Sequence, residues 1–349
     1  MKNAVFVGIV FVVLFAASCG SDNAEDTVKI PEDKSLMIEA QGYFKMLPPI
    51  VESNENPVTG PKVALGKTLF YDSRLSQNNT QSCNSCHNLA TFGVDNDATS
   101  KGDLGQNGGR NSPTVYNAAF HFAQFWDGRA KTIEDQAGMP ILNPVEMNMP
   151  SEGFVVSRLK GINGYKQLFQ DAFPNDKDPI SYLNLKKAIG AFERTLTNPG
   201  RFDQYLGGDN KAITNEEKEG LAEFISVGCI QCHTGMGLGG NMMQKFPVHG
   251  TSYVSATGSL KEDLGKMEQT KDEFDKFKFK VPSLLNITET APYFHDGSVK
   301  DLDKAISIMG KLQLNKDLSP EQIKKIHTFL NTLKGNKMVY ATTVPVMPK

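Results

Sequence analysis

The chain has 349 residues, and its 37 basic side chains nearly balance its 39 acidic ones, which gives a formal net charge of −2. This balance gives no indication of a nucleic-acid partner. The length is sufficient for two domains, each with a hydrophobic core of its own.

The N-terminus has the layout of a secretory signal. A lysine precedes an apolar run over residues 5–17, and small residues lead into Cys19. We predict a signal peptide over 1–18 and a flexible, acidic tether over 19–35. The position of Cys19 favours a periplasmic lipoprotein acylated at this residue and attached to the membrane by lipid alone. The alternative is an ordinary signal peptide with an incidental cysteine. In either case the run is too short for a stable membrane span.

The pattern Cys-x-x-Cys-His occurs twice, at 83–87 and at 229–233. Two thiols at this spacing can attach one haem covalently, and the adjacent histidine can ligate its iron. A thioredoxin-like motif would lie in a βαβ pattern, which neither segment shows, and zinc gives no reason for a histidine after both second cysteines. Export also suits c-type haem attachment, which takes place outside the cytoplasm. We predict two c-type haems, attached through Cys83 and Cys86 and through Cys229 and Cys232, with His87 and His233 as iron ligands.

Helices are the clearest predicted elements. An apolar stripe predicts a helix over 182–197, Thr214 and Glu217 form a capping box for another, and Ser319 begins a third. Long loops rich in glycine and asparagine lie between them. The predicted fold is mainly α, with two loop-rich, cytochrome c-like domains that each surround one haem. The predicted ranges are 36–200 for the first domain, 201–335 for the second and 336–349 for a C-terminal tail.

Three further features extend the haem motifs. They are Gln-Phe-Trp-Asp-Gly-Arg-Ala at 124–130, Glu146, and Tyr-Phe-His-Asp-Gly-Ser at 293–298. In this order, from about residue 47 to 335, the chain resembles the bacterial di-haem cytochrome c peroxidases. The related oxidases that mature methylamine dehydrogenase share the scaffold. The resemblance implies a peroxidatic N-terminal haem and an electron-transferring C-terminal haem.

The resemblance also implies roles for residues outside the haem motifs. Met309 matches the sixth ligand of the second haem, where a soft thioether raises the potential; without the resemblance it would be taken for a core residue. Glu146 matches an acid/base carboxylate, and Gln136 matches an amide that positions peroxide. Trp126, the only tryptophan, matches a residue that bridges the two haems.

A calcium ion between the domains is a further expectation from the family. The matching ligands are the side chain of Asn111 and the backbone carbonyls of Thr290 and Pro292, which are hard oxygen donors of the kind calcium prefers. His295 is expected to hydrogen-bond near the second haem without ligating iron.

The chain departs from the family at one position. Many members have a histidine in the loop after the first haem motif that occupies the peroxidatic iron at rest, and Asp103 stands at this place. No histidine lies between His87 and His121. We therefore hypothesise a first haem that is five-coordinate or water-bound at rest. The alternatives are that His121 swings in or that Asp103 itself binds the iron.

The predicted function is that of a cytochrome c peroxidase, which reduces hydrogen peroxide to water. A small c-type cytochrome or a cupredoxin is the expected electron donor, and a homodimer is a family expectation. One rival is a protein-modifying oxidase, in which a tyrosine replaces the methionine ligand; Met309 argues against it. A second rival is a non-catalytic electron carrier or redox sensor, which would have no use for Glu146 and Gln136.

Overall fold

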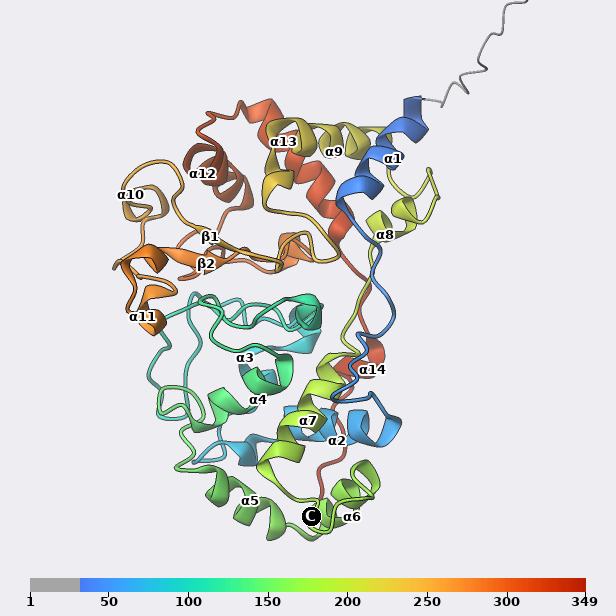
Figure 1. The fold of residues 1–349 in the computed structure, drawn as a ribbon, viewed down its shortest axis with the longest axis vertical. Coiled ribbons are helices and arrows are strands. Elements are labelled where there is room, and N and C mark those ends of the chain that lie inside the picture. The colour runs from blue at the N-terminus through green and yellow to red at the C-terminus, as the bar shows by residue number, and fades with distance from the viewer. Residues whose placement is uncertain (1–31) are drawn as a thin grey trace, which may run out of the picture.

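A computed structural model describes residues 32–349 as two helical lobes (Figure 1). The predicted signal peptide, Cys19 and the tether before Glu32 lie outside the described residues. None of the helices in the described part of the chain is long and apolar enough to cross a membrane.

The first lobe is built on the packing of α2 against α7. Gly66 brings the two backbones close together, since a Cβ at this position would lie 1.9 Å from the carbonyl oxygen of Ala188. The buried rings of Phe70 and Phe192 meet edge to face beside this contact. The helices of this lobe are α2 (Gly60–Tyr71), α3 (Cys83–Cys86), α4 (Ile133–Leu142), α5 (Glu152–Lys160), α6 (Asn163–Ala172) and α7 (Tyr182–Glu193).

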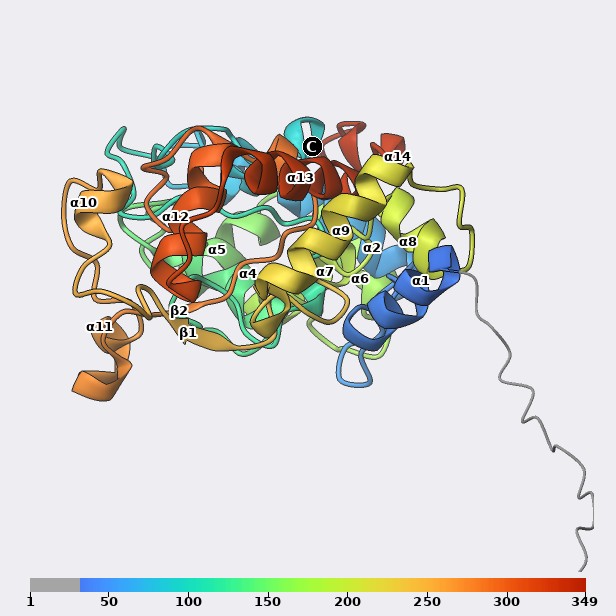
Figure 2. The same cartoon turned by 90° about the horizontal axis from the view of Figure 1, so that it is seen from above.

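The second lobe is built in the same way from α9 and α13, which lie side by side in Figure 2. A Cβ at Gly220 would lie 2.1 Å from the carbonyl oxygen of Lys325, so these backbones also approach closely. The strands β1 and β2 form an antiparallel pair with Met243 opposite Lys280. The elements are α8 (Arg201–Leu206), α9 (Asn215–Val227), β1 (Met243–Lys245), α10 (Val254–Thr257), α11 (Met267–Thr270), β2 (Lys278–Lys280), α12 (Leu302–Leu314) and α13 (Pro320–Leu330).

Both ends of the chain differ from the predicted domain ranges. The helix α1 (Glu32–Tyr43) begins inside the predicted tether, and the Phe44 ring after it packs 5.4 Å from Phe202 in the second lobe. The predicted tail 336–349 forms α14 (Val339–Thr342), where Ala341 is fully buried in the core of the first lobe. Each terminus therefore packs on the lobe that is distant from it in sequence, because its apolar side chains complete that lobe's core.

The helix predicted over 182–197 ends earlier, at Glu193. Pro199 disfavours a helical backbone at Asn198. Asn198 instead bonds Asn117 and Asn286 through their side chains at 2.7–3.3 Å. This buried asparagine cluster joins the two lobes where the chain crosses between them.

The two lobes share a local repeat. Residues 113–128 and 282–297 correspond at a constant offset of 169 residues (282 minus 113), with matching Pro, Asn, Phe, Asp and Gly. Asn117 and Asn286 have φ of 61° and 60°, and Phe125 and Phe294 have φ of 65° and 69°. Equal left-handed conformations at non-glycine residues are uncommon, so these loops share one backbone path. Trp126 and His295 occupy corresponding positions in the repeat.

Candidate haem sites and the path between them

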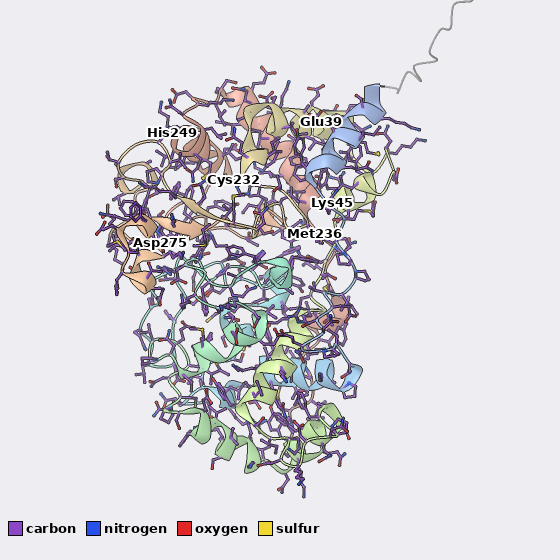
Figure 3. The ribbon with its side chains drawn as sticks, in the orientation of Figure 1. Glu39, Lys45, Cys232, Met236, His249 and Asp275 are labelled. Atoms are coloured by element: carbon purple, nitrogen blue, oxygen red, sulfur yellow. The ribbon has the colours of Figure 1, made fainter. Side chains whose placement is uncertain are left out.

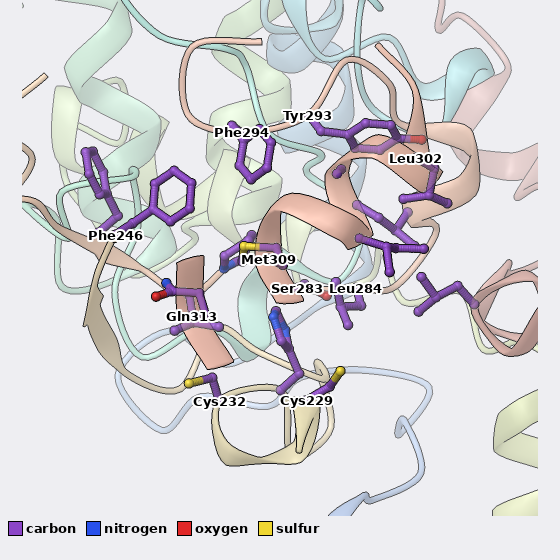
Figure 4. A pocket seen from close by; sticks show the side chains of 18 of the residues that line it. Cys229, Cys232, Phe246, Ser283, Leu284, Tyr293, Phe294, Leu302, Met309 and Gln313 are labelled. Atoms are coloured by element: carbon purple, nitrogen blue, oxygen red, sulfur yellow. The ribbon is translucent and has the colours of Figure 1, made fainter. Parts of the chain in front are cut away.

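A large cavity in the second lobe contains the second Cys-x-x-Cys-His motif. The helix α9 ends at Val227, and the following Gly228, with a φ of 104°, turns the chain into a short 3-10 turn over Cys229–Gln231. Figure 3 shows Cys232 inside this lobe. Figure 4 looks into the cavity, with Met309 of α12 facing the turn that carries Cys229 and Cys232.

The histidine of each motif is oriented by a backbone carbonyl. The Nδ1 atom of His233 lies 2.9 Å from the Leu238 oxygen, and that of His87 lies 3.0 Å from the Pro113 oxygen. A carbonyl can only accept, so each Nδ1 carries the proton and each Nε2 keeps a free lone pair. Burial lowers the pKa of both rings, which favours the neutral form that ligates metals.

The α12 helix presents one face to the second cavity. Leu302, Ala305, Ile306 and Met309 all line it. Asp301 caps the helix by accepting a hydrogen bond from the Lys304 backbone N–H. Met309 therefore lies on the apolar face of this helix, which brings it to the same cavity as His233.

The first lobe contains a corresponding cavity around the first motif. It is lined by Cys83, Cys86 and His87 and also by Gln136 of α4 and Glu146 of the loop that follows. Asn143 donates a hydrogen bond of 2.7 Å to Glu146 Oε1. Burial raises the pKa of Glu146, against the opposing influence of Arg129 and this hydrogen bond. The predicted acid and the predicted amide thus share one cavity with the first haem motif.

Glu193, at the end of α7, is a further acid in the first cavity that the sequence did not reveal. It is 4% exposed and its Oε2 has no hydrogen-bond partner in the described part of the chain. Burial, followed by the negative charge of Glu134, raises its pKa to about 8. The sequence offers no signal for it, because it follows an ordinary apolar helix stripe.

Asp103 does not direct its carboxylate into the first cavity. Its oxygens accept hydrogen bonds from the Asn78 backbone N–H at 3.0 Å and from the Thr80 hydroxyl at 2.6 Å. The neighbouring Gly102 lines the cavity, whereas Asp103 is not among its lining residues. The geometry gives no support to Asp103 as an iron ligand.

His121 is also turned away from the first cavity. It lines the second cavity, and its Nδ1 lies 2.9 Å from the Lys280 ammonium. A Cβ at Gly240 would lie 2.1 Å from the ring, so His121 is packed against bare backbone. This packing opposes the alternative in which His121 swings onto the first iron.

Trp126 lines both cavities. Its indole N–H donates a hydrogen bond of 2.9 Å to the Asn111 carbonyl. Its ring meets His295, the corresponding residue of the repeat, edge to face at 6.4 Å. The internal repeat could have drawn attention to this pair in the sequence.

The three predicted calcium ligands lie in one region between the lobes. Asn111, Thr290 and Pro292 all line the second cavity, and the Asn111 backbone N–H donates to His295 O at 2.8 Å. Residues 32–349 contain no cluster of three His, Cys, Asp or Glu residues that could hold a metal. A site made of one amide and two carbonyls is of a different kind, so calcium stays a prediction.

The residues present fit two c-type haems. Each cavity contains two unbridged thiols and a histidine with a free Nε2. With the space open to solvent included, the cavities measure about 1730 Å³ and 1860 Å³.

The fold and the paired cavities are those of a di-haem peroxidase, and the chain belongs to the di-haem cytochrome c peroxidase family. The family model for di-haem cytochrome c peroxidase matches residues 60–211. The family implies two haems.

Individual relatives agree with this assignment. The chain is 42% identical to cytochrome c551 peroxidase of Pseudomonas aeruginosa over 87% of each chain. It is 31% identical to the methylamine utilization protein MauG of Methylophilus methylotrophus, over 90% of this chain and 97% of that protein. Among solved structures, a MauG-like protein associated with microbial copper homeostasis superposes with a TM-score of 0.76 at 30% identity, covering 86% of this chain and 97% of the other.

Proposed function

We propose that this protein reduces hydrogen peroxide to two waters, using two protons and two electrons from a small c-type cytochrome or a cupredoxin. The observation that carries the proposal is the difference between the two cavities. The second contains the thioether of Met309 opposite its motif, whereas the first contains Glu146 and Gln136. The first cavity is therefore the reacting centre, and the second is the one through which electrons enter.

When bound, the haems supply an iron site for peroxide in the first cavity and a one-electron store in the second. Glu146 accepts a proton from one peroxide oxygen and returns it to the departing oxygen. Its raised pKa suits both halves of this transfer, because a carboxyl with a pKa nearer neutrality can both accept and donate. Asn143 holds the carboxylate in place, and the Gln136 amide orients the peroxide.

Electrons pass between the cavities by way of Trp126, which lines both. The name of the Pseudomonas aeruginosa relative, cytochrome c551 peroxidase, supports a c-type cytochrome as donor. The rival function of a protein-modifying oxidase gains no support from the second cavity, where Met309 lies opposite the haem motif.

The Glu146→Gln variant tests this assignment. Peroxide-dependent oxidation of a reduced small c-type cytochrome should fall by roughly 10²–10⁴-fold, the usual contribution of a positioned acid/base group. Glu152→Gln, at an exposed glutamate at the start of α5, is the matched control and should keep wild-type activity. Unchanged turnover in Glu146→Gln, with both haems retained, would show that Glu146 is not the acid/base group.

Three further properties belong to the same proposal. Cys19 is the lipid attachment point of a periplasmic protein, calcium is bound through Asn111, Thr290 and Pro292, and the active form is a homodimer.

Removing calcium with a chelator should lower the activity, and adding it back should restore the activity. Metabolic labelling with a fatty acid should mark the wild type and not the Cys19→Ala variant.

A further inference from the structure

Lys280, at the end of β2, is a buried cation without an acidic partner. The side chain is 5% exposed, and no ion pair is formed with it within residues 32–349. Burial alone lowers its pKa to about 8. By contrast, Lys278 on the same strand pairs with Asp275 at 3.1 Å. A buried charge that lacks a counter-ion destabilises the fold. An anion bound beside Lys280 would therefore stabilise it.

His121 presents a second unused donor beside Lys280. The ammonium can only donate, so His121 Nδ1, at 2.9 Å, is the acceptor and the neutral ring carries its proton on Nε2. This Nε2 is buried and has no partner in the described part of the chain. Because the ring is packed against Gly240, it cannot turn away to reach solvent.

The two arginines that line the first cavity, Arg110 and Arg129, are already neutralised. Arg110 bonds Asp127 at 2.6 Å, Asp263 at 2.7 Å and Glu268 at 3.1 Å. Arg129 also pairs with Asp127, at 2.9 Å. These guanidinium groups therefore have no need of a further anion, which sets Lys280 apart from them.

We propose that Lys280 and His121 form a carboxylate-binding site, which takes one propionate of the haem in the second cavity. Both residues line this cavity, together with His233 and Trp126. A carboxylate only accepts hydrogen bonds, which matches an ammonium and an imidazole N–H that can only donate. This inference rests on the proposed function in placing a haem in the second cavity.

The site is joined to the path between the haems. The Lys280 backbone N–H donates a hydrogen bond of 2.7 Å to the Trp126 carbonyl oxygen. The propionate is thereby held beside the residue that lines both cavities. A cation at this place disfavours the more positive, oxidised iron, so Lys280 raises the potential of the second haem.

The test compares Lys280→Met with Lys278→Met, the same substitution two residues earlier on β2. The measurements are the midpoint potential of the second haem and the propionate bending band in its resonance Raman spectrum. Lys280→Met should lower the potential and move the band, and Lys278→Met should change neither. His121→Phe should move the band as well, because it removes the second donor. An unchanged potential and an unchanged band in Lys280→Met would overturn the proposal.

Two further arms keep the result unambiguous. If Lys280→Met does not fold, Lys280→Arg should fold and keep the wild-type potential, and His121→Phe should still move the band; an unmoved band would overturn the proposal. If the midpoint potential of the second haem in the wild type changes with the concentration of added chloride or acetate, the site holds a free anion. This result would also overturn the proposal.

Loss of peroxide turnover is not a readout here. A wild-type protein with both haems and this Raman signature but no peroxidase activity would contradict the proposed function alone.

Discussion

Glu146 and Glu193 both line the first cavity and differ in their surroundings. Glu146 accepts a hydrogen bond from Asn143 and is opposed by the charge of Arg129, so its pKa is raised by less than full burial would produce. Glu193 has an oxygen without a partner, and its pKa is raised to about 8. Of the two, Glu146 has the surroundings of a group that exchanges protons, while Glu193 holds its proton at neutral pH.

The Glu193→Gln variant should change how stability depends on pH. The ordinary pKa of Glu193 is 4.5 and the folded-state value is about 8, so the folded protein retains a proton that the unfolded chain releases between these values. The wild type therefore loses stability relative to the variant as pH rises through this range, by an amount on the order of 5 kcal/mol. Thermal unfolding of both proteins at several pH values measures this difference. A difference that does not vary with pH would show that Glu193 is ionised in the folded protein.

The sequence could predict the site residues that belong to a motif. It could not predict residues whose pKa is changed by burial in the folded protein. The spacing of Cys83, Cys86 and His87 carries the chemistry of haem attachment by itself. The raised pKa of Glu193 arises from packing between helices and has no local signature. Asp103 shows the opposite case, since its position suggested a distal ligand but its hydrogen bonds hold it in the loop near Thr80.

At the scale of elements, α12 positions Met309 in the second cavity. Its Asp301 cap sets the start of the helix, and its buried face sets the direction of the methionine. A thioether ligand favours the reduced iron and so raises the potential.

Met309→Leu should lower the potential of the second haem and slow cytochrome oxidation. Leucine keeps the packing but provides no ligand. Potentiometric titration followed by absorbance measures the shift, and Met139→Leu, at an exposed methionine of α4, serves as the control. Equal potentials in wild type and Met309→Leu would rule out Met309 as the sixth ligand.

The C-terminal tail behaves as an element of the first lobe. Lys67 and Tyr71 of α2 donate side-chain hydrogen bonds to the carbonyl oxygens of Tyr340 and Ala341. Removing 336–349 should therefore destabilise the first lobe by a few kcal/mol, at about 1 kcal/mol for each lost hydrogen bond plus the lost burial. Hydrogen exchange should speed up in α2 and α6 and stay unchanged in α9 and α13. Faster exchange confined to the second lobe would contradict this assignment.

Helix starts could be predicted better than helix ends and long-range packing. The capping box at Thr214 and the proline after Ser319 are local signals, and both helices begin where these signals indicate. The end of α7 depends on Asn198, whose partners lie in distant loops. The packing of each terminus on the lobe distant from it in sequence likewise depends on which core its apolar residues complete. No local sequence pattern specifies this choice.

At the scale of the whole molecule, the proposed function assigns different roles to two similar halves. The repeat gives each lobe the same loop conformation, and the corresponding residues Trp126 and His295 meet between the cavities. The halves differ in what faces the haem motif, which is Met309 in the second cavity and Glu146 with Gln136 in the first. On this account the division of labour arises from a few side chains placed on a common frame.

The central claim is that the first haem has an open iron position at rest while the second is closed by Met309. Electron paramagnetic resonance of the fully oxidised protein tests it most directly. We predict one high-spin ferric signal from the first haem and one low-spin signal from the second, with peroxide turnover that needs no prior reduction. A second low-spin signal, typical of two nitrogen ligands on the first haem, would contradict the account.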